Sequence, residues 1–125
     1  MEQDYDKLIE QRSQHVFDVM SRRVSADELK LMQKAFEFAR KAHSWQTRKT
    51  GEPYILHPIA VATIAAEELA LSSHMVIAAF LHDVVEDTDY TIDDIRREFG
   101  DDVAFLVNVV TKHKKEKYVD SLQVD

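Results

Sequence analysis

Residues 75–87 read MVIAAFLHDVVED, and this stretch predicts a buried helix that ends in polar side chains. Residues 75–81 are all apolar, so a helix formed from them has no polar face and must be buried. The next turn carries one histidine and three carboxylates, which are His82, Asp83, Glu86 and Asp87. Because residues three and four apart are neighbours on a helix surface, these four side chains form one stripe.

This stripe has two interpretations. Neighbouring carboxylates repel one another, and burying an unpaired carboxylate is costly. A bound cation relieves both costs, and a histidine with carboxylates suits manganese, iron or zinc, while the carboxylates also suit magnesium. Alternatively, the helix end frays into water, Glu86 and Asp87 are solvated, and His82 is an ordinary half-buried histidine. The stretch by itself does not separate these two interpretations.

The composition favours a single helical domain. The chain has 125 residues, which is enough for one domain with a hydrophobic core. Apolar residues make up 45%, and there are only two glycines and two prolines, which favours helices with short connections over a turn-rich sandwich. The absence of cysteine excludes a disulfide scaffold, a thiolate metal site and a cysteine nucleophile. We therefore predict an all-α fold.

Charge and hydropathy limit the kinds of partner that the protein can have. The first six residues are acidic and polar, unlike a signal peptide, and no apolar run reaches the roughly 20 residues that span a bilayer. We therefore expect a soluble, cytoplasmic protein with no membrane partner. A net charge of −7 argues against nucleic-acid binding. Basic residues nevertheless gather in 40–51 and 112–117, where they form either a site for a small phosphorylated ligand or two solvated loops.

Hydrophobic periodicity and capping signals predict six helices. Their expected bounds are 3–21, a helix after the Ser25 and Glu28 capping box to about 42, Pro58 to about 69, about 73–87, a helix after Thr91 that stops at Gly100, and 101 or 102 through 110. Residues 43–57 break the pattern and predict a loop. As a domain division, we expect an N-terminal helix over 1–24, a core over 25–112, and a loop or mobile tail over 113–125.

Three blocks carry the most specific pattern in the chain. Residues 42–58 read AHSWQTRKTGEPYILHP, residues 79–88 read AFLHDVVEDT, and residues 99–112 read FGDDVAFLVNVVTK. In this order, the blocks resemble the start of the hydrolase domain of RelA/SpoT-type alarmone enzymes, and the resemblance covers about residues 26–112. It is more specific than the His-Asp pair alone, which recurs across the HD phosphohydrolase superfamily.

The resemblance implies an α-helical HD-domain bundle with bound Mn²⁺. It implies hydrolysis of the 3′-pyrophosphate of guanosine 3′,5′-bis(diphosphate) or its pentaphosphate analogue (ppGpp or pppGpp), which gives GDP or GTP and pyrophosphate in the stringent response. Position by position, His57, His82 and Asp83 match metal ligands, Glu86 and Asp87 match the acidic pair that positions or activates the attacking water, and Arg48, Lys49 and Thr50 match the loop that holds the guanine nucleotide.

The sequence departs from the family pattern at two points. The family's fourth metal ligand is an aspartate on a later helix, beyond Asp125, where this chain ends. We therefore expect an HD domain truncated at its C-terminal end, with poor activity or none. We also expect exposed apolar surface that favours self-association. The second departure is Trp45, which stands where the family usually has glycine.

Two other functions are compatible with the same residues. One is a generic HD phosphohydrolase that acts on another nucleotide, and the loop 48–54 argues against it because such an enzyme need not carry that loop. The other is a catalytically inactive nucleotide-binding or regulatory module. The missing fourth ligand favours this module, whereas the presence of Glu86 and Asp87 argues against it.

Overall fold

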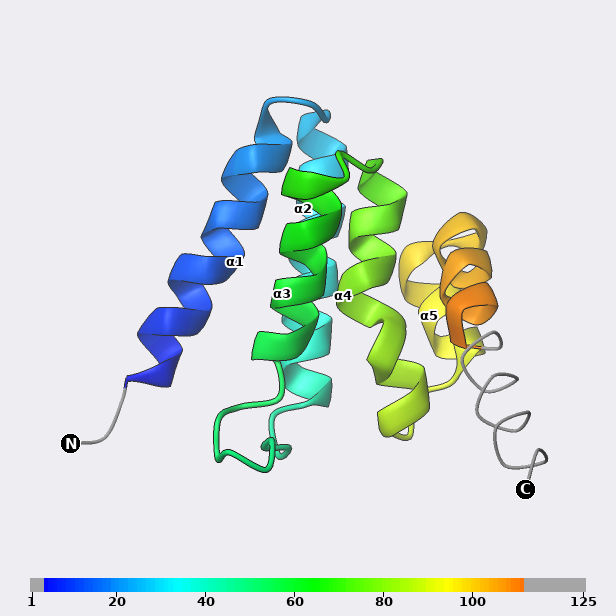
Figure 1. Cartoon of the computed structure of the whole chain (residues 1–125). Helices are drawn as coiled ribbons and strands as arrows, with labels where there is room; N and C mark the ends of the chain where they lie inside the picture. The colour runs from blue at the N-terminus through cyan, green and yellow to red at the C-terminus, as the bar shows by residue number, and fades with distance from the viewer. Residues whose placement is uncertain (1–3, 112–125) are drawn as a thin grey trace, which may run out of the picture.

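The computed structural model describes residues 4–111, and the regular elements within that range are all helical, which confirms the all-α prediction (Figure 1). In chain order they are α1 (Tyr5–Ser21), α2 (Ala26–Ala42), α3 (Leu56–Thr63), the π-helix η1 (Ile64–Glu68), α4 (Ser73–Asp87), α5 (Ile92–Phe99) and a last helix over 101–111. The tail expected over 113–125 lies outside the described residues. No helix among residues 4–111 is long and apolar enough to cross a bilayer.

Side-chain caps fix the starts of several helices at the positions the sequence predicts. Ser25 and Glu28 form a capping box at α2, and Thr91 and Asp94 form another at α5. Each box satisfies backbone N–H groups that a helix start leaves without partners. Gly100 ends α5 with a φ of 94°, a left-handed conformation that glycine adopts without steric cost.

The third helix differs from its predicted bounds. It begins at Leu56 rather than Pro58, so Pro58 occupies the third helical position instead of the first. Proline is tolerated there because the first turn's N–H groups have no partner within the helix. His57 consequently lies within the first turn instead of before it. The helix then widens into η1, where the Leu69 N–H donates to the Ile64 carbonyl at 3.0 Å.

The core joins α1, α2 and α4 through three aromatic rings. The ring centroids of Phe17, Phe36 and Phe80 lie 5.8 to 6.1 Å apart, in tilted or edge-to-face arrangements that aromatic pairs prefer. The apolar run of α4 is buried as expected: Phe80 and Leu81 are 0% exposed, and only Met75 and Ala79 within 75–81 are half-buried. This packing anchors α4 in the core up to the polar turn that follows the run.

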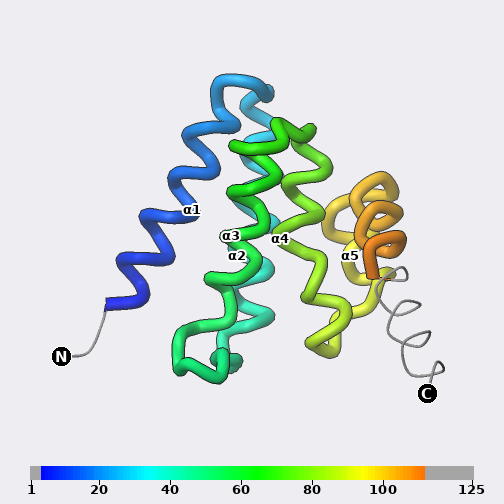
Figure 2. The backbone as a smooth tube through the Cα atoms, in the orientation of Figure 1, coloured from blue at the N-terminus to red at the C-terminus, as the bar shows by residue number. Residues whose placement is uncertain are grey.

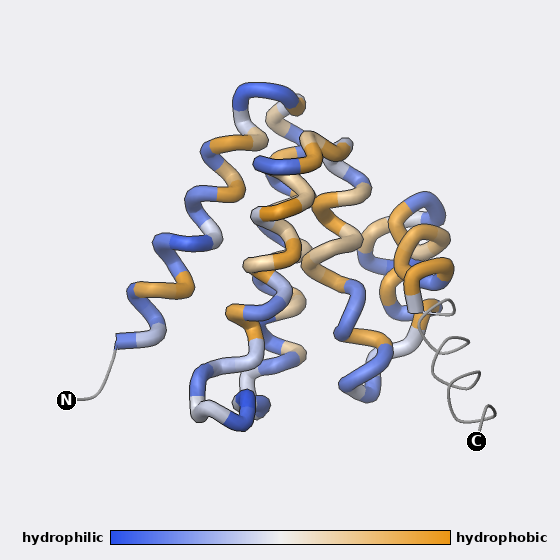
Figure 3. The backbone as a smooth tube through the Cα atoms, in the orientation of Figure 1, coloured by the Kyte–Doolittle hydropathy of each residue, from blue (hydrophilic) through white to orange (hydrophobic). Residues whose placement is uncertain are grey.

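One end of the bundle gathers the polar segments that the sequence singled out. The loop after α2, the start of α3 and the carboxyl end of α4 lie at the same end of the fold, which the tube in Figure 2 makes easy to follow. Figure 3 shows hydrophilic residues along that loop and at the end of α4, while apolar residues dominate the middle of α3 and the middle of α4. The helical packing therefore brings together residues 43–57 and 82–87.

Candidate metal centre

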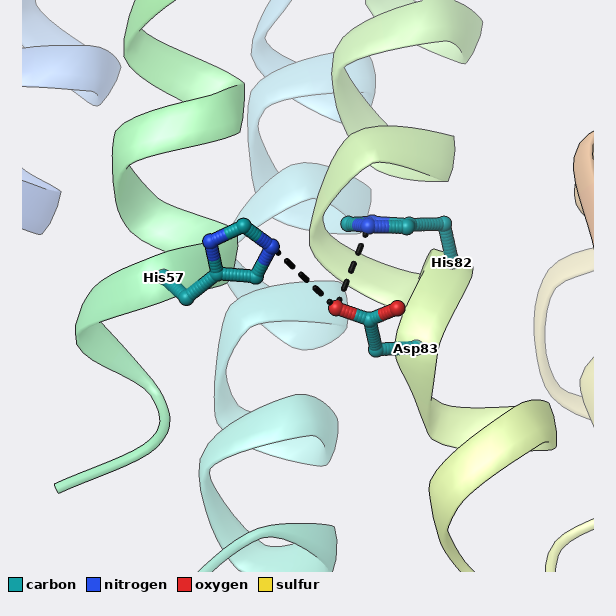
Figure 4. A group of neighbouring side chains, drawn as sticks. All are labelled: His57, His82 and Asp83. Atoms are coloured by element: carbon teal, nitrogen blue, oxygen red, sulfur yellow. Dashed lines mark ion pairs between the residues drawn. The ribbon is translucent and has the colours of Figure 1, made fainter. Parts of the chain in front are cut away.

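The first turn of α3 and the last turns of α4 place three ligand-type side chains together. One ligand atom from each of His57, His82 and Asp83 lies within 4.8 Å of the others, so the group could hold a metal ion (Figure 4). Asp83 Oδ2 lies 3.5 Å from His57 Nε2 and 3.1 Å from His82 Nε2. The structure thus brings together the three residues that the family resemblance matched to metal ligands.

His82 presents a defined nitrogen to this centre. Its Nδ1 lies 2.7 Å from the Ala79 carbonyl oxygen, which can only accept a hydrogen bond, so Nδ1 carries a proton. In the neutral imidazole, Nε2 then holds a lone pair, and this is the atom that faces Asp83. A backbone carbonyl that fixes the tautomer in this way is a usual partner of a metal-ligating histidine.

The buried carboxylate makes the centre a suitable cation site. Asp83 is 0% exposed, so its negative charge receives no stabilisation from bulk water. Two imidazole nitrogens and one carboxylate oxygen converge on one point, a donor set that suits Mn, Fe or Zn. Three protein ligands leave coordination positions for water or substrate, as in catalytic sites. The residues present therefore fit a divalent metal.

Tyr54 adds a hydrogen bond to the same carboxylate. Its hydroxyl donates to Asp83 Oδ2 at 2.8 Å and also lies 3.1 Å from Asp87 Oδ2. Burial raises the pKa of the Tyr54 phenol above its ordinary value of 10.0, and the hydrogen bond and negative charge of Asp83 raise it further. The phenol is therefore protonated and acts as a donor.

The two remaining acidic residues of the stripe differ in environment. Glu86 is half-buried on α4, whereas Asp87, the last residue of α4, is exposed and lies beside the Tyr54 hydroxyl. The alternative of a frayed, solvated helix end fits the exposure of Asp87. It does not fit the helix, which stays regular to Asp87, or the full burial of Asp83.

The loop with the basic residues folds back toward the metal centre. An antiparallel bridge joins Thr47 to Pro53, the Arg48 N–H donates to the Glu52 carbonyl at 2.9 Å, and Gly51 turns the chain with a φ of 92°. An open pocket of about 750 Å³ lies over this loop. Its lining includes Arg48, Lys49, Thr50 and Asp87. The predicted nucleotide loop and Asp87 of the predicted acidic pair therefore line the same pocket, whereas Glu86 is not part of its lining.

Two residues of the site were missed in the sequence. Tyr54 appeared only as part of the block over 42–58, and His43 only as part of that block and of the basic segment 40–51. In the structure, the His43 ring is 2% exposed, packs against the Tyr54 ring with centroids 4.8 Å apart, and donates a hydrogen bond from Nδ1 to Gln46 Oε1 at 2.6 Å. No local pattern signals these contacts. Trp45, by contrast, is 71% exposed and lies on the surface.

The fold and the centre define an HD-domain protein. A family model described as "HD domain" matches residues 35–124, and the chain belongs to this family. The histidine and aspartate of α4 lie within the matched range, as does His57 of α3. The HD-domain bundle expected from the sequence is thereby confirmed.

The chain is similar to curated SpoT-like proteins. It is 46% identical over 118 residues to a protein of Aquifex aeolicus named guanosine-3′,5′-bis(diphosphate) 3′-pyrophosphohydrolase, covering 94% of this chain and 15% of the relative. It is 49% identical over 94 residues to the bifunctional (p)ppGpp synthase/hydrolase SpoT of Escherichia coli, and the match covers 75% of this chain and 13% of the relative. A relative from Streptomyces coelicolor is named GTP pyrophosphokinase. It is 43% identical over 82% of this chain and 12% of its own length.

A solved structure agrees with these sequence relatives. The structure described as "A metazoan ortholog of SpoT hydrolyzes ppGpp and plays a role in starvation responses" matches with a TM-score of 0.63 and 37% identity, over 70% of this chain and 49% of that one. The resemblance to RelA/SpoT-type hydrolase domains is thereby confirmed. The chain spans about one seventh or less of the length of these three curated relatives, and about half of the solved structure.

Proposed function

We propose that this chain carries the metal centre and nucleotide loop of a guanosine-3′,5′-bis(diphosphate) 3′-diphosphatase. The proposed reaction consumes one water and converts ppGpp or pppGpp to GDP or GTP and pyrophosphate. The observation that carries the proposal is the convergence of His57, His82 and Asp83 beside a pocket that both Asp87 and the basic loop line. The names of relatives from Aquifex and Escherichia support the same substrate class.

The chain's own residues divide the work between two adjoining regions. The guanidinium of Arg48 can stack on a base or pair with phosphate, and Lys49 adds a point charge to the same exposed loop. Glu86 and Asp87 can accept a proton from an attacking water, provided that the water lies within hydrogen-bonding distance of one of them. This arrangement places an anion-binding surface next to a proton acceptor.

The proposed cofactor is Mn²⁺, held by His57, His82 and Asp83. When bound, a divalent ion supplies Lewis-acid polarisation of a phosphoryl oxygen. The imidazole and carboxylate donors favour manganese, iron or zinc over magnesium as the resident ion. The choice of manganese rests on the family resemblance, and the donor set supports it without selecting it.

The local basic loop also accounts for an anionic substrate on an acidic chain. The net charge is −7, yet Arg48 and Lys49 lie together on the pocket wall. Charges close to a bound anion act at short range, while salt screens the more distant acidic residues. A small guanine nucleotide therefore fits this surface better than an extended nucleic acid.

The test is an assay of pyrophosphate release from ppGpp with and without Mn²⁺. We expect release that EDTA stops and that Glu86→Gln abolishes, because the proposed reaction needs both a divalent ion and a proton acceptor. The control variant is Glu98→Gln on α5, which removes an exposed carboxylate elsewhere. Release that is independent of both the metal and Glu86 would contradict the proposal.

Two outcomes would favour the alternative functions. Calorimetric binding of ppGpp without turnover under any metal would identify a nucleotide-binding module. Equal turnover of GTP and ppGpp would identify a generic HD phosphohydrolase, since the loop would then add no selectivity. Self-association through exposed apolar surface, and the cytoplasmic location, stay predictions.

A further inference from the structure

The Tyr54 hydroxyl lies between two carboxylates but has only one proton to donate. Its oxygen is 2.8 Å from Asp83 Oδ2 and 3.1 Å from Asp87 Oδ2. A phenol carries a single O–H donor, so a linear hydrogen bond can form to only one of the two oxygens at a time. The state of the metal centre can decide which carboxylate receives it.

Without a cation, Asp83 is the stronger acceptor. It is 0% exposed, so no bulk water can replace the phenol as its donor, and hydrogen bonds gain strength in such a dry environment. Asp87 is exposed and can be hydrated instead. The shorter distance to Asp83 agrees with this order.

A cation at the centre reverses the order. Asp83 Oδ2, the oxygen that accepts from Tyr54, is also the oxygen that faces Nε2 of both His57 and His82. A divalent ion held by these three residues would withdraw electron density from Oδ2 and make it a poorer acceptor of the Tyr54 hydrogen bond. Asp87 is not one of these three ligands and keeps its full negative charge.

The ring of Tyr54 is held so that its hydroxyl stays between the two acceptors. The ring packs on His43 with centroids 4.8 Å apart and lies edge-to-face with the His57 ring, with centroids 5.8 Å apart. The Tyr54 backbone N–H donates to the Gln46 carbonyl at 3.0 Å. The hydrogen bond can therefore change acceptor by rotation of the O–H alone, without movement of the ring.

We propose that Tyr54 is a positioning residue whose hydroxyl passes its hydrogen bond from Asp83 to Asp87 when a divalent cation binds to His57, His82 and Asp83. The consequence is that exposed Asp87 is fixed over the pocket only in the metal-loaded site. This inference rests on the metal centre in the proposed function and adds a link between metal loading and the orientation of a pocket carboxylate.

The experiment is NMR of the full chain with tyrosines labelled by ¹³C at Cζ, titrated with diamagnetic Zn²⁺. The Tyr54 resonance is the one missing from Tyr54→Phe. In the wild type we expect it to shift at Zn²⁺ saturation, and in Asp87→Ala we expect the shift to fall to half or less, because the second acceptor is gone. Asp89→Ala removes an exposed carboxylate two residues away and should leave the shift unchanged.

Calorimetry with Zn²⁺ provides the second readout. The hydroxyl no longer bonds to Asp83 when the cation is bound, so Tyr54→Phe should change Zn²⁺ affinity by less than about tenfold. Loss of a residue that supports a metal ligand typically costs about 10–100-fold in affinity. Tyr5→Phe on α1 is the matched control. Where hydrolysis is measurable, Tyr54→Phe should lower kcat and leave KM unchanged.

The outcomes separate this inference from the proposed function. An equal Tyr54 shift in wild type and Asp87→Ala, or a loss of Zn²⁺ affinity as large as that of His82→Ala, would overturn the inference alone. Absence of pyrophosphate release with a normal Zn²⁺-induced transfer would overturn the function and leave the inference standing. Absence of Zn²⁺ binding would overturn both.

Discussion

His57 Nε2 lies 3.5 Å from Asp83 Oδ2, across the interface between α3 and α4. The two side chains come from helices that the η1 segment and a short connection separate in sequence. Their proximity depends on the packing of α3 against α4 and on the start of α3 at Leu56, which brings His57 into the first helical turn. A shift of one residue in the register of α3 against α4 would turn the contacting position by about 100° around the helix axis.

The metal centre predicts a loss of cation binding on removal of a histidine. His82→Ala should reduce Mn²⁺ affinity by at least about 100-fold. Loss of a residue that only hydrogen-bonds to a metal ligand already lowers metal affinity by about 10–100-fold, and loss of the ligand itself should cost more. Calorimetric titration of metal-stripped protein measures the effect. His74→Ala is the matched control because His74 is exposed at the start of the same helix. Equal affinity in both variants would rule out His82 as a ligand.

The loop pocket predicts weaker nucleotide binding when its guanidinium is removed. Arg48→Ala should weaken ppGpp binding about tenfold, equivalent to about 1.4 kcal/mol, through loss of stacking and charge. Arg48→Lys should recover only part of this loss, because an ammonium has no planar face. Lys41→Ala, an exposed change on α2, serves as the control in the same calorimetric titration. Binding unchanged in Arg48→Ala would exclude this loop as the nucleotide site.

The aromatic core predicts a large loss of stability at Phe80. Phe80→Ala should lower the free energy of unfolding by about 3–5 kcal/mol, because it removes a fully buried ring that contacts Phe17 and Phe36. Urea denaturation followed by circular dichroism measures this change. Phe105→Ala removes a ring that is 66% exposed and should change stability by less than about 0.5 kcal/mol. Similar losses in both variants would contradict the assigned core.

A hydrogen bond between α2 and α4 predicts a pH-dependent contribution to stability. The Ser73 hydroxyl and the Ser25 backbone N–H lower the pKa of Glu28 below its ordinary 4.5. Because the folded state holds the carboxylate ionised, the stabilisation is present above pH 4.5 and is lost as the pH falls through the lowered pKa. Glu28→Gln should therefore destabilise the protein at pH 7.

Thermal unfolding between pH 7 and about pH 2 checks the Glu28 prediction. The difference in Tm between wild type and Glu28→Gln should shrink as the pH falls. Glu37→Gln, an exposed change on the same helix, should show a small difference with no such trend. A difference in Tm that stays constant from pH 7 down to about pH 2 would show that ionisation of Glu28 contributes nothing to stability.

Local signals determined most of the helices. Ser25 with Glu28 and Thr91 with Asp94 are capping pairs three residues apart, so the chain need not fold further for them to act. The apolar run over 75–81 likewise predicted a buried helix, because its signal lies within one short segment of the chain. The error at α3 also has a local cause: proline is tolerated throughout the first turn, so Pro58 does not specify one position.

The family resemblance matched three positions of the sequence to metal ligands. Helical spacing predicted the polar stripe on α4. The sequence alone determined the all-α class, the capped starts of α2 and α5, and the neighbourhood of His82, Asp83 and Glu86, because each depends on contacts within one helix. Only the tertiary structure decided that His57 meets Asp83, that Asp83 is fully buried and that Tyr54 reaches two carboxylates. Those contacts join α4 to a different helix and to a loop, and side-chain packing between separate segments leaves no periodic trace in the chain.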